Sequence, residues 1–79
     1  MSLHWVDHQD GQYSLWGRSA SDTSLSGQVE RCFGIVRLAS DGPTVTWSAT
    51  ARNGLERTFR SFSGAKRWLR LIAKLEGAL

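Results

Sequence analysis

The fold of this chain is decided by residues 44–79, which read TVTWSATARNGLERTFRSF (44–62) followed by SGAKRWLRLIAKLEGAL (63–79). The first segment begins by alternating apolar residues with hydroxyl-bearing ones, which predicts a strand that buries one face. Asn53-Gly54 predicts a type I′ turn, because both central residues of that turn need positive φ. Residues 56–62 then predict a second strand of the same hairpin. The apolar positions of the first strand are Val45, Trp47, Ala49 and Ala51, which alternate with Thr44, Thr46, Ser48 and Thr50.

The last segment predicts an amphipathic helix that begins at Ser63. This serine suits the N-cap position, where its hydroxyl accepts a hydrogen bond from a first-turn amide. Apolar residues then recur at steps of three and four and form one stripe. The stripe consists of Ala65, Trp68, Leu69, Ile72, Leu75 and Leu79, and the opposite side carries Lys66, Arg67, Arg70 and Lys74, with Leu71 exposed among them.

Three further segments precede this unit. Residues 4–7 and 12–16 flank an Asp-Gly pair, which predicts a hairpin. Residues 17–27 are rich in Ser, Gly, Asp and Thr, so we expect a mobile loop there. Residues 29–38 predict the strongest strand, which ends at a turn over residues 40–43. Its faces carry Cys32, Gly34, Val36 and Leu38 on one side and Arg31, Phe33, Ile35 and Arg37 on the other.

These elements predict an α+β fold in a single domain over residues 1–79. We expect an antiparallel meander sheet, made of the N-terminal hairpin plus three strands, with one C-terminal amphipathic helix packed on one face. A chain of 79 residues has a small core, and its single cysteine excludes an internal disulfide. The other sheet face is left to water, a second copy or a ligand. Strand addition at an unpaired edge would allow a homodimer.

Positive charge is concentrated toward the C-terminus. The chain has ten Lys and Arg against seven Asp and Glu, and six of the ten fall within residues 57–74, which contain no acid. We expect the sheet face that the helix leaves uncovered to carry the binding arginines. Arginine and hydroxyl residues on a sheet face suit phosphate contacts, and arginine reads guanine edges in a major groove. The basic side of the helix has three interpretations: a solvated face, a phosphate contact, or a surface for an acidic protein or lipid. The candidate nucleic-acid or partner-binding residues are Arg31, Arg37, Thr46, Ser48, Arg52, Arg57, Arg60, Lys66, Arg67, Arg70 and Lys74.

Short motifs in this region resemble a known family. They are Gly34-Ile35-Val36-Arg37, Trp47-Ser48-Ala49-Thr50-Ala51 and Arg57-Thr58-Phe59-Arg60-Ser61-Phe62-Ser63, with Ala65 behind them. In this order they resemble the ethylene-response-factor DNA-binding domain of plants, and they are similar to the arm-type DNA-binding domain of phage and transposon integrases. The resemblance covers roughly residues 33–76 and implies a three-stranded sheet that enters the major groove of DNA. It implies that Arg37, Trp47, Arg57 and Arg60 face DNA or support the strands that do, whereas strand alternation places Trp47 in the core.

No motif in the sequence predicts catalysis, a metal or a cofactor. The chain contains neither a glycine-rich phosphate loop nor a nucleophile elbow. His4, Asp7, His8 and Asp10 lie close in sequence, but their spacing matches no strong metal site. We expect no small-molecule substrate and no membrane association, since no apolar run approaches the ~20 residues of a membrane span. The lack of a secretory signal predicts a cytoplasmic protein, in which Cys32 is a buried thiol.

The sequence therefore predicts a small non-catalytic nucleic-acid-binding module from a phage or other mobile element, with double-stranded DNA favoured over RNA. The alternative is a phage or plasmid inhibitor that binds a host protein complex, either a defence complex of the CRISPR type or one that handles nucleic acid. The N-terminal hairpin and the loop at residues 17–27 favour this alternative, because a DNA-reading sheet does not need them.

Overall fold

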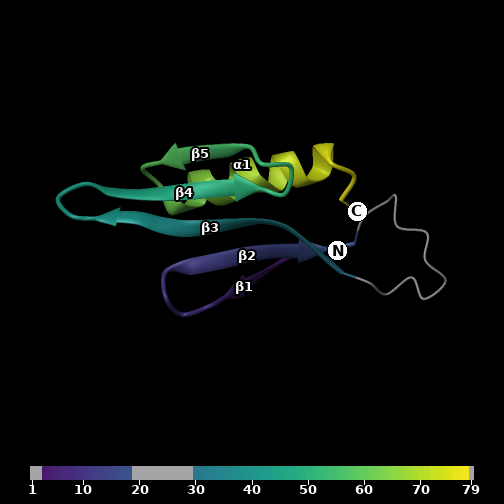
Figure 1. Cartoon of the computed structure of the whole chain (residues 1–79), viewed down its shortest axis with the longest axis horizontal. Coiled ribbons are helices and arrows are strands. Elements are labelled where there is room, and N and C mark those ends of the chain that lie inside the picture. The colour runs from purple at the N-terminus through teal and green to yellow at the C-terminus, as the bar shows by residue number, and fades with distance from the viewer. Residues whose placement is uncertain (1–2, 19–29, 79) are drawn as a thin grey trace.

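The computed structural model describes residues 3–18 and 30–78 (Figure 1). These residues form one five-stranded antiparallel sheet in the order β1-β2-β3-β4-β5 and one helix, which confirms the predicted α+β meander. Of the loop expected at residues 17–27, Gly17 belongs to the sheet, Arg18 follows it, and the remainder lies outside the described residues. The elements are β1 (His4–Asp7), β2 (Gln12–Gly17), β3 (Arg31–Asp41), β4 (Val45–Ala51), β5 (Glu56–Phe59) and α1 (Phe62–Leu75).

The helix α1 packs along β3, β4 and β5, on one face of the sheet (Figure 1). The strand register separates this helix-side face from an open face. On the helix-side face, Leu15, Gly34 and Ala51 form one row across β2, β3 and β4. The open face has two aligned rows of polar character, since side chains alternate along each strand. These rows are Ser14, Ile35, Thr50 and Glu56, and Gln12, Arg37, Ser48 and Thr58.

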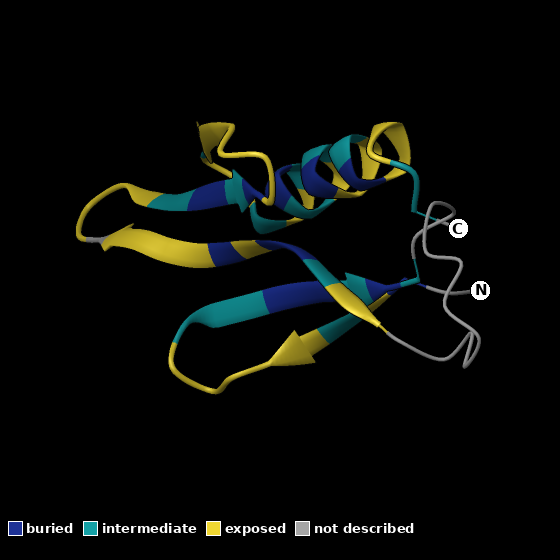
Figure 2. Ribbon diagram, turned by 45° about the vertical axis from the view of Figure 1, so that its right-hand side comes forward, coloured by how far each residue is buried: buried dark blue, intermediate teal, exposed yellow. Residues whose placement is uncertain are grey.

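Small residues let α1 approach the sheet closely. Ala49 and Ala51 on the sheet, and Ala65 and Ala73 on the helix, are all buried. Gly34 has no β-carbon, and a β-carbon built there would lie 2.6 Å from Leu69 Cδ1 and 2.6 Å from the Thr50 carbonyl oxygen. Leu69 therefore occupies the space that any larger residue at position 34 would need. Figure 2 shows the buried residues concentrated in the middle of the strands and on α1, with exposed residues at the hairpin turns.

Aromatic rings pack between the start of α1 and the sheet. Phe62, at the start of α1, lies 4.6 Å from both Tyr13 and Trp47, measured between ring centroids. A second ring pair, Phe59 and Trp68, lies 5.8 Å apart and joins β5 to α1. The tilted rings agree with the expected geometry of aromatic pairs. Trp47 thus packs on the helix side of the sheet, as strand alternation predicts.

A β-bulge in β3 makes the predicted assignment of its side chains to two faces partly wrong. Leu15 pairs with Gly34 while the next residue, Trp16, pairs with Cys32, so Phe33 is the extra residue. Phe33 is 1% exposed and belongs to the hydrophobic core, although simple alternation placed it beside Ile35 and Arg37. The strand also ends later than predicted, at Asp41 instead of residue 38, so it includes the first two residues of the turn expected at 40–43, and it begins at Arg31 instead of residue 29.

The β4–β5 hairpin has a three-residue loop rather than the predicted two-residue type I′ turn. Gly54 N donates to Ala51 O at 3.0 Å, and Ala51 N donates to Leu55 O at 2.7 Å. Gly54 has φ +97°, whereas Asn53 does not have positive φ. This is the pattern of a type I turn followed by a left-handed glycine. The Asn53 side chain instead accepts a hydrogen bond from Leu55 N at 3.0 Å.

The N-cap of the helix lies two residues earlier than predicted. Ser61, not Ser63, is the N-cap residue, and its hydroxyl accepts a hydrogen bond from Gly64 N at 2.9 Å. The last strand accordingly stops at Phe59 rather than at residue 62. The predicted apolar stripe is also shifted, because Ala73 is buried while Leu75 is 77% exposed. Leu71, at 57%, is exposed as expected, and Leu79 lies outside the described residues.

We expect Gly34→Ala to destabilise the fold by about 1–3 kcal/mol, the usual cost of overpacking a closed core. The added methyl group has no space, because one of its neighbours is backbone and the other is the buried Leu69. Denaturant unfolding of the variant measures the effect. Gly42→Ala is the control, since a β-carbon there meets only Ser40 Oγ at 3.9 Å. Equal midpoints for the two variants would refute the close contact.

Removing the N-cap hydroxyl by Ser61→Ala is expected to lower the free energy of unfolding by about 1 kcal/mol. Ser63→Ala is the comparison, because Ser63 lies in the first helical turn and its hydroxyl, 3.1 Å from that of Ser61, does not itself cap the helix. Thermal or denaturant unfolding distinguishes the two serines. A larger loss for Ser63→Ala than for Ser61→Ala would contradict the helix start described above.

Candidate nucleic-acid interface

The predicted binding residues do not gather on the open sheet face. Of the arginines in the strands, the register places Arg37 alone on that face, in a row with Ser48. Thr46 shares the face by alternation along β4. Arg31 and Arg57 lie on the helix side, opposite Gly17 and Ala49 respectively. The expectation that the open face carries the arginines is therefore wrong.

Acidic groups offset the charge of the open face. The Glu56 carboxylate accepts hydrogen bonds from Ser48 Oγ at 3.1 Å and Thr50 Oγ1 at 3.2 Å. Ser48 is itself 7% exposed, so its hydroxyl is already engaged and largely covered. The recess beside Arg37 has a volume of about 460 Å³ and is also lined by Asp10. Among the described residues, this face is unsuited to a polyanion.

Three arginines lie elsewhere. The Arg52 guanidinium sits over the Phe33 ring, 5.7 Å from its centroid, at the end of β4. The Arg57 guanidinium sits over the Phe59 ring at 5.4 Å and remains exposed on the edge strand β5. Arg60 is exposed in the link between β5 and α1. Such ring contacts hold a guanidinium in place without neutralising its charge.

The densest group of cations lies on the side of α1 that faces away from the sheet. We call Ser63, Arg67, Arg70 and Lys74 the basic ridge. All four are exposed, and they follow one another at steps of four, three and four residues, so they form one line along the helix. Lys66 flanks the ridge, with Nζ 5.0 Å from the Phe62 ring centroid and 5.4 Å from that of Trp5. Between the long side chains of this surface lies an open hollow of about 580 Å³, which is lined by Ser63, Lys66, Arg67, Arg70, Leu71 and Lys74.

The basic ridge carries charge that the rest of the described chain does not compensate. The sequence of α1 contains four cations and no acid, a charge of +4, while the whole chain has +3, so all other residues together contribute −1. Within the described residues, no carboxylate lies within ion-pair distance of Arg67, Arg70 or Lys74. A helix N-terminus would favour acids in its first turn, and α1 has none there.

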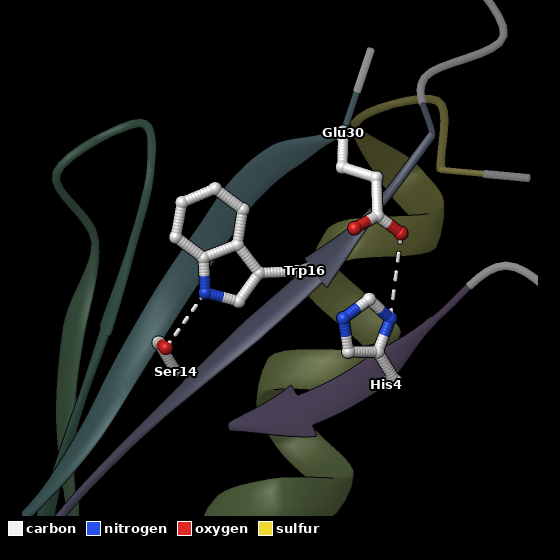
Figure 3. Close-up of polar contacts among 4 residues, drawn as sticks. All are labelled: His4, Ser14, Trp16 and Glu30. Carbon is white, nitrogen blue, oxygen red and sulfur yellow. Dashed lines mark hydrogen bonds and ion pairs between the residues drawn. The ribbon is translucent and has the colours of Figure 1, made fainter. Parts of the chain in front are cut away.

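A polar network on β2 has a structural explanation. Trp16 Nε1 donates to Ser14 Oγ at 2.7 Å (Figure 3), and His8 Nε2 lies 2.8 Å from the same oxygen. Ser14 is 3% exposed, so this hydroxyl is covered and already bonded, unlike a nucleophile that must meet a substrate. His4 Nδ1 lies 3.5 Å from Glu30 Oε2 and links β1 to the start of β3 when the imidazole is protonated.

Two further sequence expectations concern cysteine and metal. Cys32 is half-buried rather than fully buried, and its thiol lies 3.5 Å from the Gly34 carbonyl oxygen. In the part of the chain that the structure describes, no group of three His, Cys, Asp or Glu side chains is placed to hold a metal ion.

Comparisons of this chain with protein-family models, curated proteins and solved structures gave no match. The described helix is also too short and too charged to cross a membrane.

The sequence did not reveal which side of the sheet Arg57 occupies. A two-residue turn at Asn53-Gly54 would pair Ala49 with Thr58, whereas the observed three-residue loop pairs Ala49 with Arg57. This shift by one residue moves every side chain of β5 to the other face. The helix cations Lys66, Arg67, Arg70 and Lys74 were found from helical spacing alone, because that spacing does not depend on strand register.

Proposed function

We propose that this protein is a small non-catalytic nucleic-acid-binding module that acts in the cytoplasm and binds through the helix side of the fold. The observation that carries the proposal is the charge of α1: four cations, no acid, and an exposed ridge with no ion pair among the described residues. A phosphate backbone is the partner that such a surface suits best, because it presents regularly spaced negative charges.

The geometry of the basic ridge supports phosphate contacts. From Ser63 to Lys74 the helix rises about 16 Å at ~1.5 Å per residue. Neighbouring ridge residues have β-carbons about 5–6 Å apart. Arg57 adds a further guanidinium on the same side of the sheet, on the neighbouring edge strand. A phosphate backbone running along α1 would thus meet several cations at once.

The resemblance to plant and integrase DNA-binding domains suggests a sheet that enters DNA, but the open face supports this mode poorly. That face has Arg37 as its one strand arginine, together with Glu56 and the nearby Asp10. A carboxylate close to a phosphate is repelled by it, since both are negative. We therefore retain nucleic acid as the proposed partner and assign the contact to α1 instead of the sheet.

Salt dependence provides the test. The logarithm of affinity for a mixed-sequence DNA duplex is expected to fall linearly with the logarithm of salt concentration, with a slope of about −0.9 per phosphate contact. Arg67→Ala, Arg70→Ala and Lys74→Ala should each weaken binding and flatten the slope by about 0.9. Arg37→Ala removes the same charge from the opposite face and should leave the slope unchanged.

Fluorescence anisotropy at several salt concentrations gives these slopes, and unfolding midpoints verify that each variant is folded. Binding that does not respond to salt would contradict the proposal. A larger effect from Arg37→Ala than from the ridge variants would place the contact on the open face.

The exposed leucines beside the basic ridge favour one second candidate. Leu71 and Leu75 are 57% and 77% exposed on the same helix. A phosphate backbone offers no apolar surface against which they could be buried. A partner protein with an acidic and partly apolar surface would bury both leucines and pair with the cations. This matches an inhibitor that occupies the nucleic-acid site of a host defence complex.

For this second candidate, affinity capture from nuclease-treated host lysate should retain a partner that Leu71→Asp with Leu75→Asp releases. Leu55→Asp is the control, because Leu55 is similarly exposed, at 52%, but lies in the β4–β5 loop. Capture that survives the double substitution, or that disappears after nuclease treatment, would count against a protein partner at this surface.

A further inference from the structure

We infer that α1 lies in the major groove of B-form duplex DNA, with Arg67 and Arg70 directed at base edges and Lys66 and Lys74 at the phosphates. The inference rests on the proposed function and makes it more specific. It names the form of nucleic acid, the element that enters it, and the two residues that give sequence preference.

The shape of the helix side fits this groove. An α-helix with its side chains is about 10–12 Å wide, and the major groove of B-DNA is about 12 Å wide, so it admits one helix. In this fold α1 is the whole second layer, and the sheet lies entirely on one side of it (Figure 1). The basic ridge therefore projects from the molecule as a single rod, with no second helix beside it among the described residues.

The aromatic residues disfavour single-stranded nucleic acid. Proteins that bind single strands stack bases on exposed rings. Here Tyr13, Trp47 and Phe62 pack on one another, and Phe59 packs on Trp68. Of the remaining described rings, Phe33 is 1% exposed, Trp5 lies under Lys66, and the Trp16 indole donates to Ser14. All described Phe, Tyr and Trp rings other than Phe33 are half-buried and contact neighbouring side chains, so no fully exposed ring of these types stands next to the basic ridge.

Duplex RNA is disfavoured by the same rod-like shape. The major groove of A-form RNA is deep and too narrow for protein side chains to read, and its minor groove is wide and shallow. A projecting helix with a line of long cations along its crest reaches bases only in the B-form major groove.

The order of residues along the ridge assigns their roles. Arg67 and Arg70 lie in its middle, between Ser63 and Lys74, so they point deepest into the groove. Each guanidinium has the planar fork that pairs with O6 and N7 of guanine, whereas lysine contacts phosphate as a point charge. Lys66 and Lys74 lie beside and beyond this centre. Leu71 borders it, and its apolar side chain suits the methyl group of thymine.

The test compares three probes of one sequence at one salt concentration: a DNA duplex, the matching RNA duplex, and the single DNA strand, each about 16 nucleotides long. The DNA duplex is expected to bind at least about tenfold more tightly than the other two. Selection from a pool of random DNA duplexes should then enrich a motif that contains guanine. Replacing its guanines with 7-deazaguanine removes N7 and should weaken binding about fivefold or more.

Arg70→Lys separates base reading from charge. The variant keeps the positive charge, so the salt slope should remain, while discrimination between the enriched motif and random duplex falls about fivefold or more. Lys74→Arg is the control and should preserve both quantities.

The outcomes separate the two proposals. If none of the three probes binds, the proposed function itself fails. Equal affinity for the three probes, a lack of enrichment, or insensitivity to 7-deazaguanine would overturn the major-groove inference while leaving phosphate binding intact. Preferential binding of the single strand or of RNA would reassign the partner.

Discussion

The contact between Leu69 and Gly34 fixes how this molecule is assembled. Leu69 fills the space where a β-carbon would stand on β3, so helix and sheet approach more closely than larger residues would allow. Buried alanines on both layers, among them Ala49 and Ala65, extend the same close contact. A chain this small has little other apolar area to bury, which makes the fit of these few residues decisive for its stability.

The same contact determines which way the charges of the helix point. Once Ala65, Leu69 and Ala73 face the sheet, the 3.6-residue period leaves the basic ridge on the far side. The ring contacts of Lys66 and Arg57 direct two further cations to the helix side. The functional proposals therefore follow from core packing: the residues that hold the helix down also present its cations outward.

Helical and strand periodicity were sufficient to predict much of this fold from the sequence. The alternation at Val45–Ala51 identified β4, and the spacing of Ala65, Leu69 and Ile72 identified α1. Features that shift a register by one residue were missed. Strict alternation of side chains along a strand cannot predict the bulge that buries Phe33. The Asn53-Gly54 pair fits both a two-residue turn and the observed three-residue loop. Ser63 was predicted as the N-cap, but Phe62 is already helical and packs on Trp47, so the cap lies at Ser61.

In the candidate site, too, the helix residues could be predicted from the sequence and the strand residues could not. The helix cations were predictable because one face of a helix is set by local spacing. The positions of the strand arginines could not be predicted, because the face that each one occupies depends on loop length and on a bulge. A register shift of one residue moves each side chain to the other face of the sheet. Arg57 is the clearest example: the loop at residues 52–54 moves it from the open face to the side occupied by α1.

The most direct measurement of the central claim is an NMR titration of the labelled protein with a short DNA duplex. We predict that amide shifts concentrate on residues 63–74 and on Arg57, with the row of Arg37, Ser48 and Thr58 unaffected. Shifts that concentrate on that row, with α1 unchanged, would contradict the claim that the helix side of the fold is the binding surface.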